Sequence, residues 1–133
     1  MKILKYIIKF LKAKKTISIP IKKEILIFDR MGAKDCEKYF KKYKYSVLDI
    51  RGESLNLFIL LKSLLKFKLN FRAYLETYIE TVKPNILLTF IDSNQYFYSL
   101  SRKFSKIKTV VLQRGVKSHF NDLFAFYKSF KIK

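Results

Sequence analysis

Four short polar turns interrupt an otherwise apolar and basic chain, and they contain the side chains best suited to chemistry. They are residues 29–32 (DRMG), 51–53 (RGE), 92–94 (DSN) and 113–115 (QRG). Carboxylates can exchange protons with a ligand, and arginines donate paired hydrogen bonds to phosphate or carboxylate groups. Glycine lets a backbone approach a ligand closely, and all three glycines of the chain stand in these turns. The turns together would suit an anionic or hydroxyl-rich ligand.

Each polar turn follows a short apolar run that is typical of a buried strand. The runs are residues 24–29, 46–50, 85–91 and 107–112. Ligands of open α/β sheets bind beyond the carboxyl ends of the strands, so a ligand-binding edge is favoured. The alternative is that Asp92, Ser93 or Asn94 only caps the helix that follows, and that Asp29 does the same after the first run.

Segments with helical spacing alternate with these runs. We predict helices over residues 33–43, about 55–82 with a break near 68–70, 94–104 and 121–131. Pro84 ends the second of these, because the residue before a proline is pushed out of the helical conformation. The alternation predicts an α/β fold, a Rossmann-like parallel sheet of at least four strands with helices on both faces.

The N-terminal segment, residues 1–15, has the pattern of a basic amphipathic helix. Its lysines surround one apolar face formed by Leu4, Ile7, Ile8 and Leu11. Such a helix can lie on an anionic membrane, or it can pack on the domain or on a partner. We therefore divide the chain into a helix with its connector, residues 1–22, and a Rossmann-like domain, residues 23–133.

The charge of the chain points to polyanionic partners. The 133 residues suggest one domain, and 29 Lys and Arg against 10 Asp and Glu give a formal net charge of +19. Nucleic acid, an anionic membrane surface and phosphorylated substrates are candidates. A codon bias that enriches Lys, Ile, Phe, Tyr and Asn is an alternative origin of the same composition.

Several classes of site are not expected. The turn after the first run is no G-x-G-x-x-G fingerprint, and the chain has no Walker A loop or G-x-S-x-G elbow. The single cysteine, Cys36, excludes a disulfide or a cysteine-based metal site within one chain. Cys36 and His119 could form a nucleophile and base, but a small buried hydrophobe is the favoured interpretation of Cys36. We expect no cofactor and no metal, and a cytoplasmic setting, because no transmembrane stretch or secretory signal is evident.

Four segments resemble a family of bacterial surface-carbohydrate biosynthesis proteins. They are ILIFDRMG (residues 25–32), LDIRGESLN (48–56), PNILLTFIDSNQYFY (84–98) and VLQRGVK (111–117). The family is similar to glycosyltransferases of the two-Rossmann-domain (GT-B) type and is linked to lipopolysaccharide O-antigen and capsule assembly. The resemblance runs in order from about Lys23 to the C-terminus.

The resemblance also implies a set of site residues. The matching positions are Arg51, Gly52, Glu53, Asp92, Asn94, Gln113 and Gly115. Glu53 and Asp92 are the candidates for a catalytic base or an acceptor hydroxyl contact, and Arg51 and Arg114 would bind anionic groups. The family usually has Asn where this chain has Ser93 and Arg114, so both departures lie at the expected crevice.

A GT-B enzyme has two Rossmann-like halves, and the C-terminal half holds most of the sugar-nucleotide donor site. The resemblance therefore implies an N-terminal, acceptor-side half that is not catalytic alone. Its expected partners are a C-terminal half or separate subunit, and a carbohydrate or phosphate-linked lipid acceptor at the inner face of the cytoplasmic membrane. A small basic nucleic-acid-binding α/β domain and an inactive remnant or interaction module are the alternatives.

Overall fold

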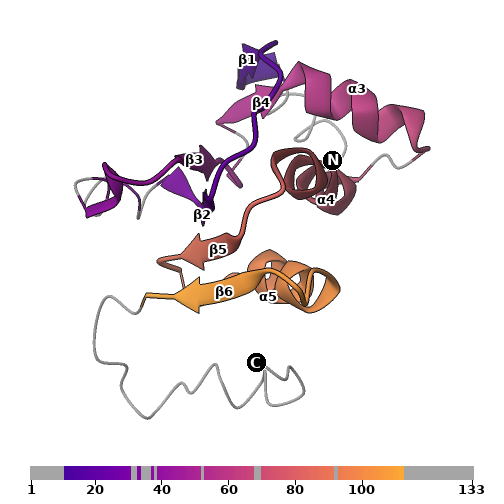
Figure 1. Cartoon of the computed structure of the whole chain (residues 1–133). Helices are drawn as coiled ribbons and strands as arrows, with labels where there is room; N and C mark the ends of the chain where they lie inside the picture. The colour runs from indigo at the N-terminus through magenta and orange to yellow at the C-terminus, as the bar shows by residue number, and fades with distance from the viewer. Residues whose placement is uncertain are drawn as a thin grey trace.

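The computed structural model describes residues 11–30, 33, 37, 39–51, 53–67, 70–91 and 93–112 (Figure 1). Its centre is a four-stranded parallel sheet in the order β3-β2-β5-β6. The strands are β2 (Ile25–Phe28), β3 (Tyr45–Leu48), β5 (Ile86–Thr89) and β6 (Lys108–Val111). Each of them overlaps one of the four predicted runs, so the predicted α/β fold with a Rossmann-like parallel sheet is confirmed.

The central strand β2 is buried along its whole length, which explains its uninterrupted apolar sequence. Its last residue, Phe28, pairs with Leu48 of β3 on one side and with Thr89 of β5 on the other. The carboxyl ends of these three strands therefore lie level with one another at a single edge of the sheet.

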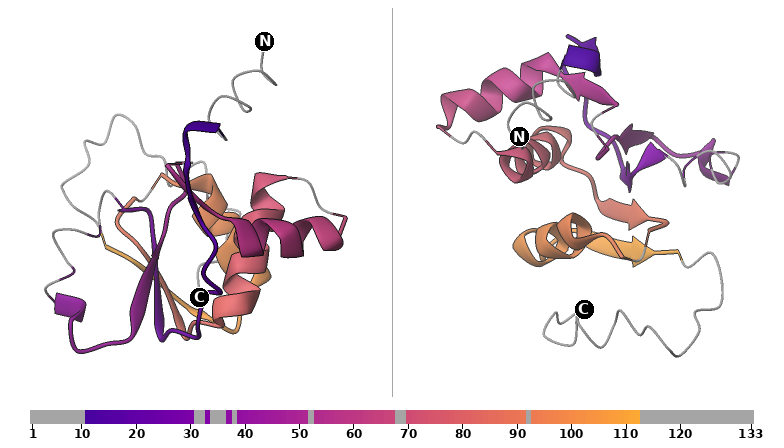
Figure 2. Two further views of the ribbon diagram at one scale, coloured as in Figure 1. Left: turned by 90° about the horizontal axis from the view of Figure 1, so that it is seen from above. Right: turned by 180° about the vertical axis from the view of Figure 1, so that it is seen from behind.

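Two apolar clusters cover the two faces of the sheet. On one face Leu26, Phe28 and Leu87 pack against helices, and Figure 2 shows the described helices together on one side of the sheet. On the other face Ile27 and Leu88 pack with residues of the segment that follows β2 and with Phe90. The helices on the first face are α3 (Leu57–Leu65), α4 (Phe71–Val82) and α5 (Gln95–Lys103).

Polar residues define the ends of these helices. The side chain of Asn56 caps α3 by accepting from the Ile59 N–H at 3.1 Å, and Asn70 caps α4 by accepting from the Ala73 N–H at 2.8 Å. The predicted break near residues 68–70 is thereby confirmed. Lys83 ends α4 in a left-handed conformation, with φ of 49°, and its N–H donates to the Ile79 carbonyl at 2.8 Å, a common way for a helix to end. The helix therefore stops before Pro84, as predicted.

A second, two-stranded sheet corrects one of the sequence predictions. In it β1 (Lys14–Thr16) pairs in parallel with β4 (Ser54–Asn56). The predicted helix over residues 1–15 is wrong at Lys14 and Lys15, whereas α3 begins at Leu57, directly after β4 and close to the start predicted near residue 55. Backbone pairing across the sheet, including a 2.8 Å bond from the Lys14 N–H to the Glu53 carbonyl, is preferred there over local helical bonds.

Other predicted helical segments fall outside the described residues. They are residues 1–10, most of 33–43, and 121–131. Within the part of the chain that the structure describes, no helix is long and apolar enough to cross a membrane.

Candidate functional site

The carboxyl edge of the sheet contains the topological switch point of the fold. From β2 the chain passes to β3 on one side and later to β5 on the other. At such a point the connections diverge to opposite faces of the sheet and leave room for a ligand. The residues directly after β2, β3 and β5 therefore form the candidate site.

Asp29, directly after β2, forms an ion pair with Arg51, which follows β3. The Arg51 Nε lies 2.8 Å from the Asp29 Oδ2. The Asp29 side chain is 1% exposed, whereas that of Arg51 is 45% exposed. The hydrogen bond and the negative charge of Asp29 raise the pKa of Arg51, so the guanidinium remains a cation.

The backbone of Asp29 has an uncommon conformation. Its φ is 78°, in the region that favours glycine, although aspartate tolerates it better than most residues. Its N–H still donates to the Leu48 carbonyl at 3.0 Å, which extends the pairing of β2 with β3. Such a conformation costs about 1–3 kcal/mol and persists where surrounding contacts fix it, often at functional sites.

Asp49 holds the turn that presents Arg51. Its carboxylate accepts from the Arg51 N–H at 2.9 Å and from the Ser54 hydroxyl at 3.1 Å. The residue is only 7% exposed. Sequence reasoning missed Asp49 because it stands inside an apolar run, and the signal for it was a carboxylate in such a run just before the Arg-Gly pair.

Thr89 joins the carboxyl ends of β2 and β5. Its buried hydroxyl donates to the Phe28 carbonyl at 3.3 Å and accepts from the Ile91 N–H at 3.2 Å. The ends of β2 and β5 are thus held together by a side chain in addition to the strand pairing.

The predicted site residues have different outcomes. Arg51 and the exposed Glu53 share one turn, and the charge of Glu53 adds to the raised pKa of Arg51. Asn94 is the cap of α5, because its side-chain oxygen accepts from the Tyr96 and Phe97 N–H groups at 3.0 and 3.3 Å. The capping alternative therefore describes Asn94, and a ligand contact there stays a prediction. Outside the described residues lie Gly52, Asp92, Gln113, Arg114 and Gly115.

A shallow groove of about 460 Å³ lies at the opposite, amino end of the strands. It is mostly apolar and is lined by Ile79, Glu80, Lys83, Pro84, Phe104 and Ile107. The groove contains none of the predicted site residues. Among the described side chains, no group of three or more His, Cys, Asp or Glu is placed to hold a metal ion.

Comparison with known proteins gave no relative: no family model, no curated protein and no solved structure matched the chain significantly. The chemistry of the carboxyl edge therefore follows from its own residues alone. An oriented, half-exposed guanidinium stands beside an exposed carboxylate, above two buried carboxylates that fix its position.

Proposed function

We propose that this chain is the acceptor-side half of a glycosyltransferase-like protein of surface polysaccharide or lipopolysaccharide biosynthesis. The observation that carries the proposal is the ion pair of Asp29 and Arg51, which holds a guanidinium at the carboxyl edge of a Rossmann-like sheet next to Glu53. The similarity of the four sequence segments supplies the class of protein.

Arg51 is the proposed contact for an anionic part of the acceptor. Asp29 engages its Nε, and the side chain is still 45% exposed. A guanidinium has five N–H donors in a fixed plane, so the remaining donors can bind a phosphate in two-pronged fashion. The buried carboxylate reduces the freedom of the arginine before the ligand arrives and thereby lowers the entropic cost of binding.

Glu53 is the proposed contact for an acceptor hydroxyl. It is exposed and lies two residues from Arg51 on the same turn. A carboxylate there can accept a hydrogen bond from a sugar hydroxyl and can take its proton during transfer. Asp92, the other predicted carboxylate, keeps the same proposed role.

Transfer itself also needs a bound sugar donor, and we assign that task to a C-terminal half or a separate subunit. The chain alone is proposed to bind the acceptor without catalysing transfer. Its net charge of +19 would suit a phosphate-linked lipid acceptor at the inner face of the cytoplasmic membrane.

The test compares two arginine variants by calorimetric titration with a prenyl-phosphate-linked monosaccharide. Arg51→Ala should weaken binding at least about tenfold, because a charge-assisted hydrogen-bonding group is lost. Arg72→Ala is the matched control, since Arg72 is 52% exposed and also forms an ion pair, with Glu76 on α4. Equal losses in both variants would indicate nonspecific charge attraction and would contradict the proposal.

Nucleic-acid binding is the alternative function that must be distinguished from acceptor binding. Binding that rests on charge alone falls steeply with salt because condensed counterions are released. An oligonucleotide that binds more tightly than the glycolipid, with a steep salt dependence, would favour the nucleic-acid function instead.

A further inference from the structure

Helix α3 has an apolar face turned away from the rest of the molecule. Its buried residues, Ile59 and Ser63, lie on the side that packs against α4. At 100° per residue, the opposite side is centred on Leu61 and includes Leu64 and Leu65. These three leucines are 58%, 39% and 73% exposed. The core-facing side of α3 is also apolar, because Ile59, Phe58 and Leu60 belong to the apolar cluster on the sheet. A surface helix normally has polar residues on its outward side.

Two lysines, Lys62 of α3 and its C-cap Lys66, do not interrupt this face. The ammonium of Lys62 donates to the Thr81 hydroxyl of α4 at 3.1 Å, and Lys66 forms an ion pair with Glu80, which is also in α4. Both side chains therefore reach back toward α4. The outward side of α3 remains a continuous leucine surface.

Phe67 extends this surface beyond the end of the helix. Its side chain is 96% exposed, and its backbone has a φ of 54°. A left-handed conformation costs a residue with a Cβ about 1–2 kcal/mol. Phe67 directly follows Lys66, the C-cap of α3, and its N–H donates to the Leu64 carbonyl at 2.8 Å, so its left-handed backbone ends the helix. The aromatic ring in water gives no stability to the folded chain, and it adds to the exposed apolar side chains of α3.

More exposed apolar side chains lie near the other end of α3. There the Asn56 side chain donates to the Ser18 carbonyl at 2.7 Å, which holds the segment after β1 against the start of the helix. Ile17 and Ile19, on either side of Ser18, are 77% and 64% exposed. Strand β1, which contacts α3, adds exposed basic residues: Lys14 and Lys15.

We propose that α3, Phe67 and the adjoining Ile17 and Ile19 dock on an anionic lipid surface. We call this set of residues the α3 surface. A large exposed apolar patch marks an interaction site, and apolar side chains bordered by lysines suit the boundary between lipid headgroups and acyl chains. A second copy of the chain is a poorer occupant, because it would bring another net charge of +19 to the same surface. Glu80, an acidic residue near this surface, forms an ion pair with Lys66, so its charge is neutralised and does not oppose an anionic surface.

The docking surface is distinct from the acceptor edge. The inference does not depend on the proposed glycosyltransferase function. Plain phospholipid vesicles contain no sugar acceptor, so failure to bind them and failure to bind the glycolipid are separate results.

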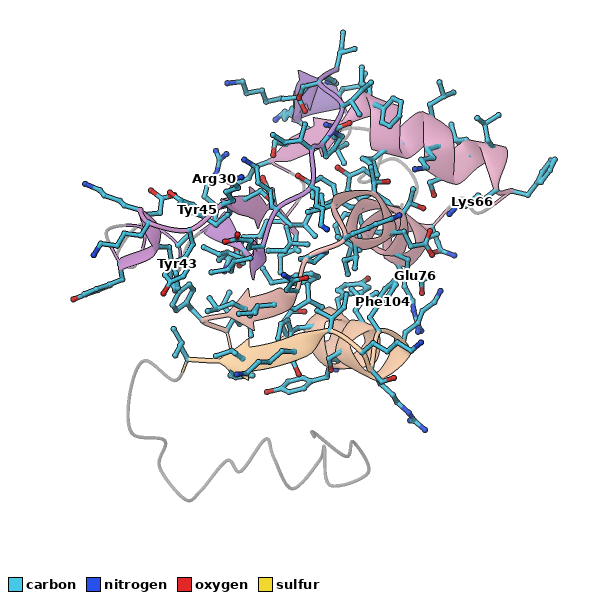
Figure 3. The ribbon with its side chains drawn as sticks, viewed as in Figure 1. Arg30, Tyr43, Tyr45, Lys66, Glu76 and Phe104 are labelled. Atoms are coloured by element: carbon cyan, nitrogen blue, oxygen red, sulfur yellow. The ribbon has the colours of Figure 1, made fainter. Side chains whose placement is uncertain are left out.

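The experiment is co-sedimentation of the full chain with phosphatidylcholine vesicles, with and without phosphatidylglycerol. We expect binding to the anionic vesicles, and a loss of at least about tenfold in the triple variant Leu61→Ser, Leu65→Ser, Phe67→Gly. Tyr43→Ser is the matched control, because Tyr43 is 55% exposed and lies on the opposite side of the molecule from Lys66 (Figure 3). This control should bind as the unmodified chain does.

The single variant Phe67→Gly keeps the proposal testable if the triple variant does not fold. It should bind anionic vesicles less tightly while remaining folded by circular dichroism. Unchanged binding in Phe67→Gly and the triple variant would overturn the proposal, as would absence of binding by the unmodified chain. Light scattering that shows a dimer lost in Phe67→Gly would assign the α3 surface to a second copy and would also overturn it.

Discussion

The Arg51 guanidinium donates to the buried Asp29 carboxylate at 2.8 Å and so joins the carboxyl ends of β3 and β2. The two residues are 22 positions apart in sequence, and both belong to polar turns that follow strands of the central sheet. The Asp49 carboxylate fixes the same turn by accepting a hydrogen bond from the Arg51 N–H. Two buried carboxylates therefore fix the position of one half-exposed arginine.

The backbone of Asp29 gives a test that is independent of any ligand. Asp29→Gly and Asp29→Ala both remove the ion pair, but only glycine adopts a φ of 78° without steric cost. Asp29→Gly should therefore be more stable than Asp29→Ala by about 1 kcal/mol in urea unfolding. Equal stabilities would contradict the left-handed conformation at this position.

Glu76 should make stability depend on pH in the acid range. Its side chain is 11% exposed, between α4 and α5, and it binds Arg72 at 3.2 Å and Lys103 at 2.5 Å (Figure 3). Burial alone would raise the pKa of Glu76, but the bonds and charges of Lys103 and Arg72 outweigh it and lower the pKa. The stabilisation is therefore present above the pKa of the unfolded glutamate and is lost as the pH falls through the lower folded value.

Glu76→Gln should reduce the free energy of unfolding by about 2 kcal/mol at neutral pH, and the difference should shrink in acid as the unmodified glutamate becomes protonated. Urea unfolding across this range measures it. Glu80→Gln is the control, because Glu80 and its partner Lys66 are both exposed and such pairs contribute less than about 1 kcal/mol. A difference that persists unchanged at low pH would rule out the ion pairs as its cause.

Tyr74 should limit stability in the alkaline range. Burial raises its pKa to about 12, although the Asn56 N–H donates to its hydroxyl at 2.9 Å and lowers the pKa in part. Because the unfolded tyrosine has a pKa near 10.0, the stabilisation is complete below that value and is lost as the pH rises through the folded one.

In Tyr74→Phe the Asn56 N–H loses its acceptor, so we expect a loss of about 1–3 kcal/mol at neutral pH. This variant should also lose less stability than the unmodified chain between neutral pH and about pH 11. Urea unfolding at the two pH values tests both statements. An identical alkaline loss in both proteins would exclude Tyr74 as its origin.

Phe67→Gly should stabilise the chain. Glycine removes the cost of a φ of 54°, and a side chain that is 96% exposed contributes almost no packing that could be lost. We expect a gain of about 1 kcal/mol in the free energy of unfolding. Phe67→Ala is the control, because it removes the ring without relieving the backbone. If glycine and alanine are equally stable, the strain assigned to Phe67 is absent.

Local patterns were sufficient to predict most of the sheet and its helices. The four apolar runs, the break at Asn70 and the stop before Pro84 all depend on residues close together in sequence. The pairing of β1 with β4 was missed because it joins Lys14 to Ser54 over a long separation, and an exposed lysine-rich strand has no apolar pattern of its own.

The candidate site was predictable only in part. Strand-end position identified the turns that contain Asp29 and Arg51, because parallel strands bring their carboxyl ends to one edge. Which carboxylate would pair with the arginine, and the supporting role of Asp49, depend on side-chain directions that a sequence pattern does not contain. Asn94 was predicted as a ligand contact and is found as a helix cap, because its residue type and position fit both roles.

The central claim is that an acceptor binds at the carboxyl edge of the sheet. The most direct measurement is the change in backbone amide NMR shifts of the full chain on addition of a prenyl-phosphate-linked monosaccharide. We predict that the largest changes occur at Asp29, Arg51 and Glu53, and that they disappear in Arg51→Ala. Changes confined to the groove around Ile79 and Phe104, or to the α3 surface, would contradict the proposed acceptor site.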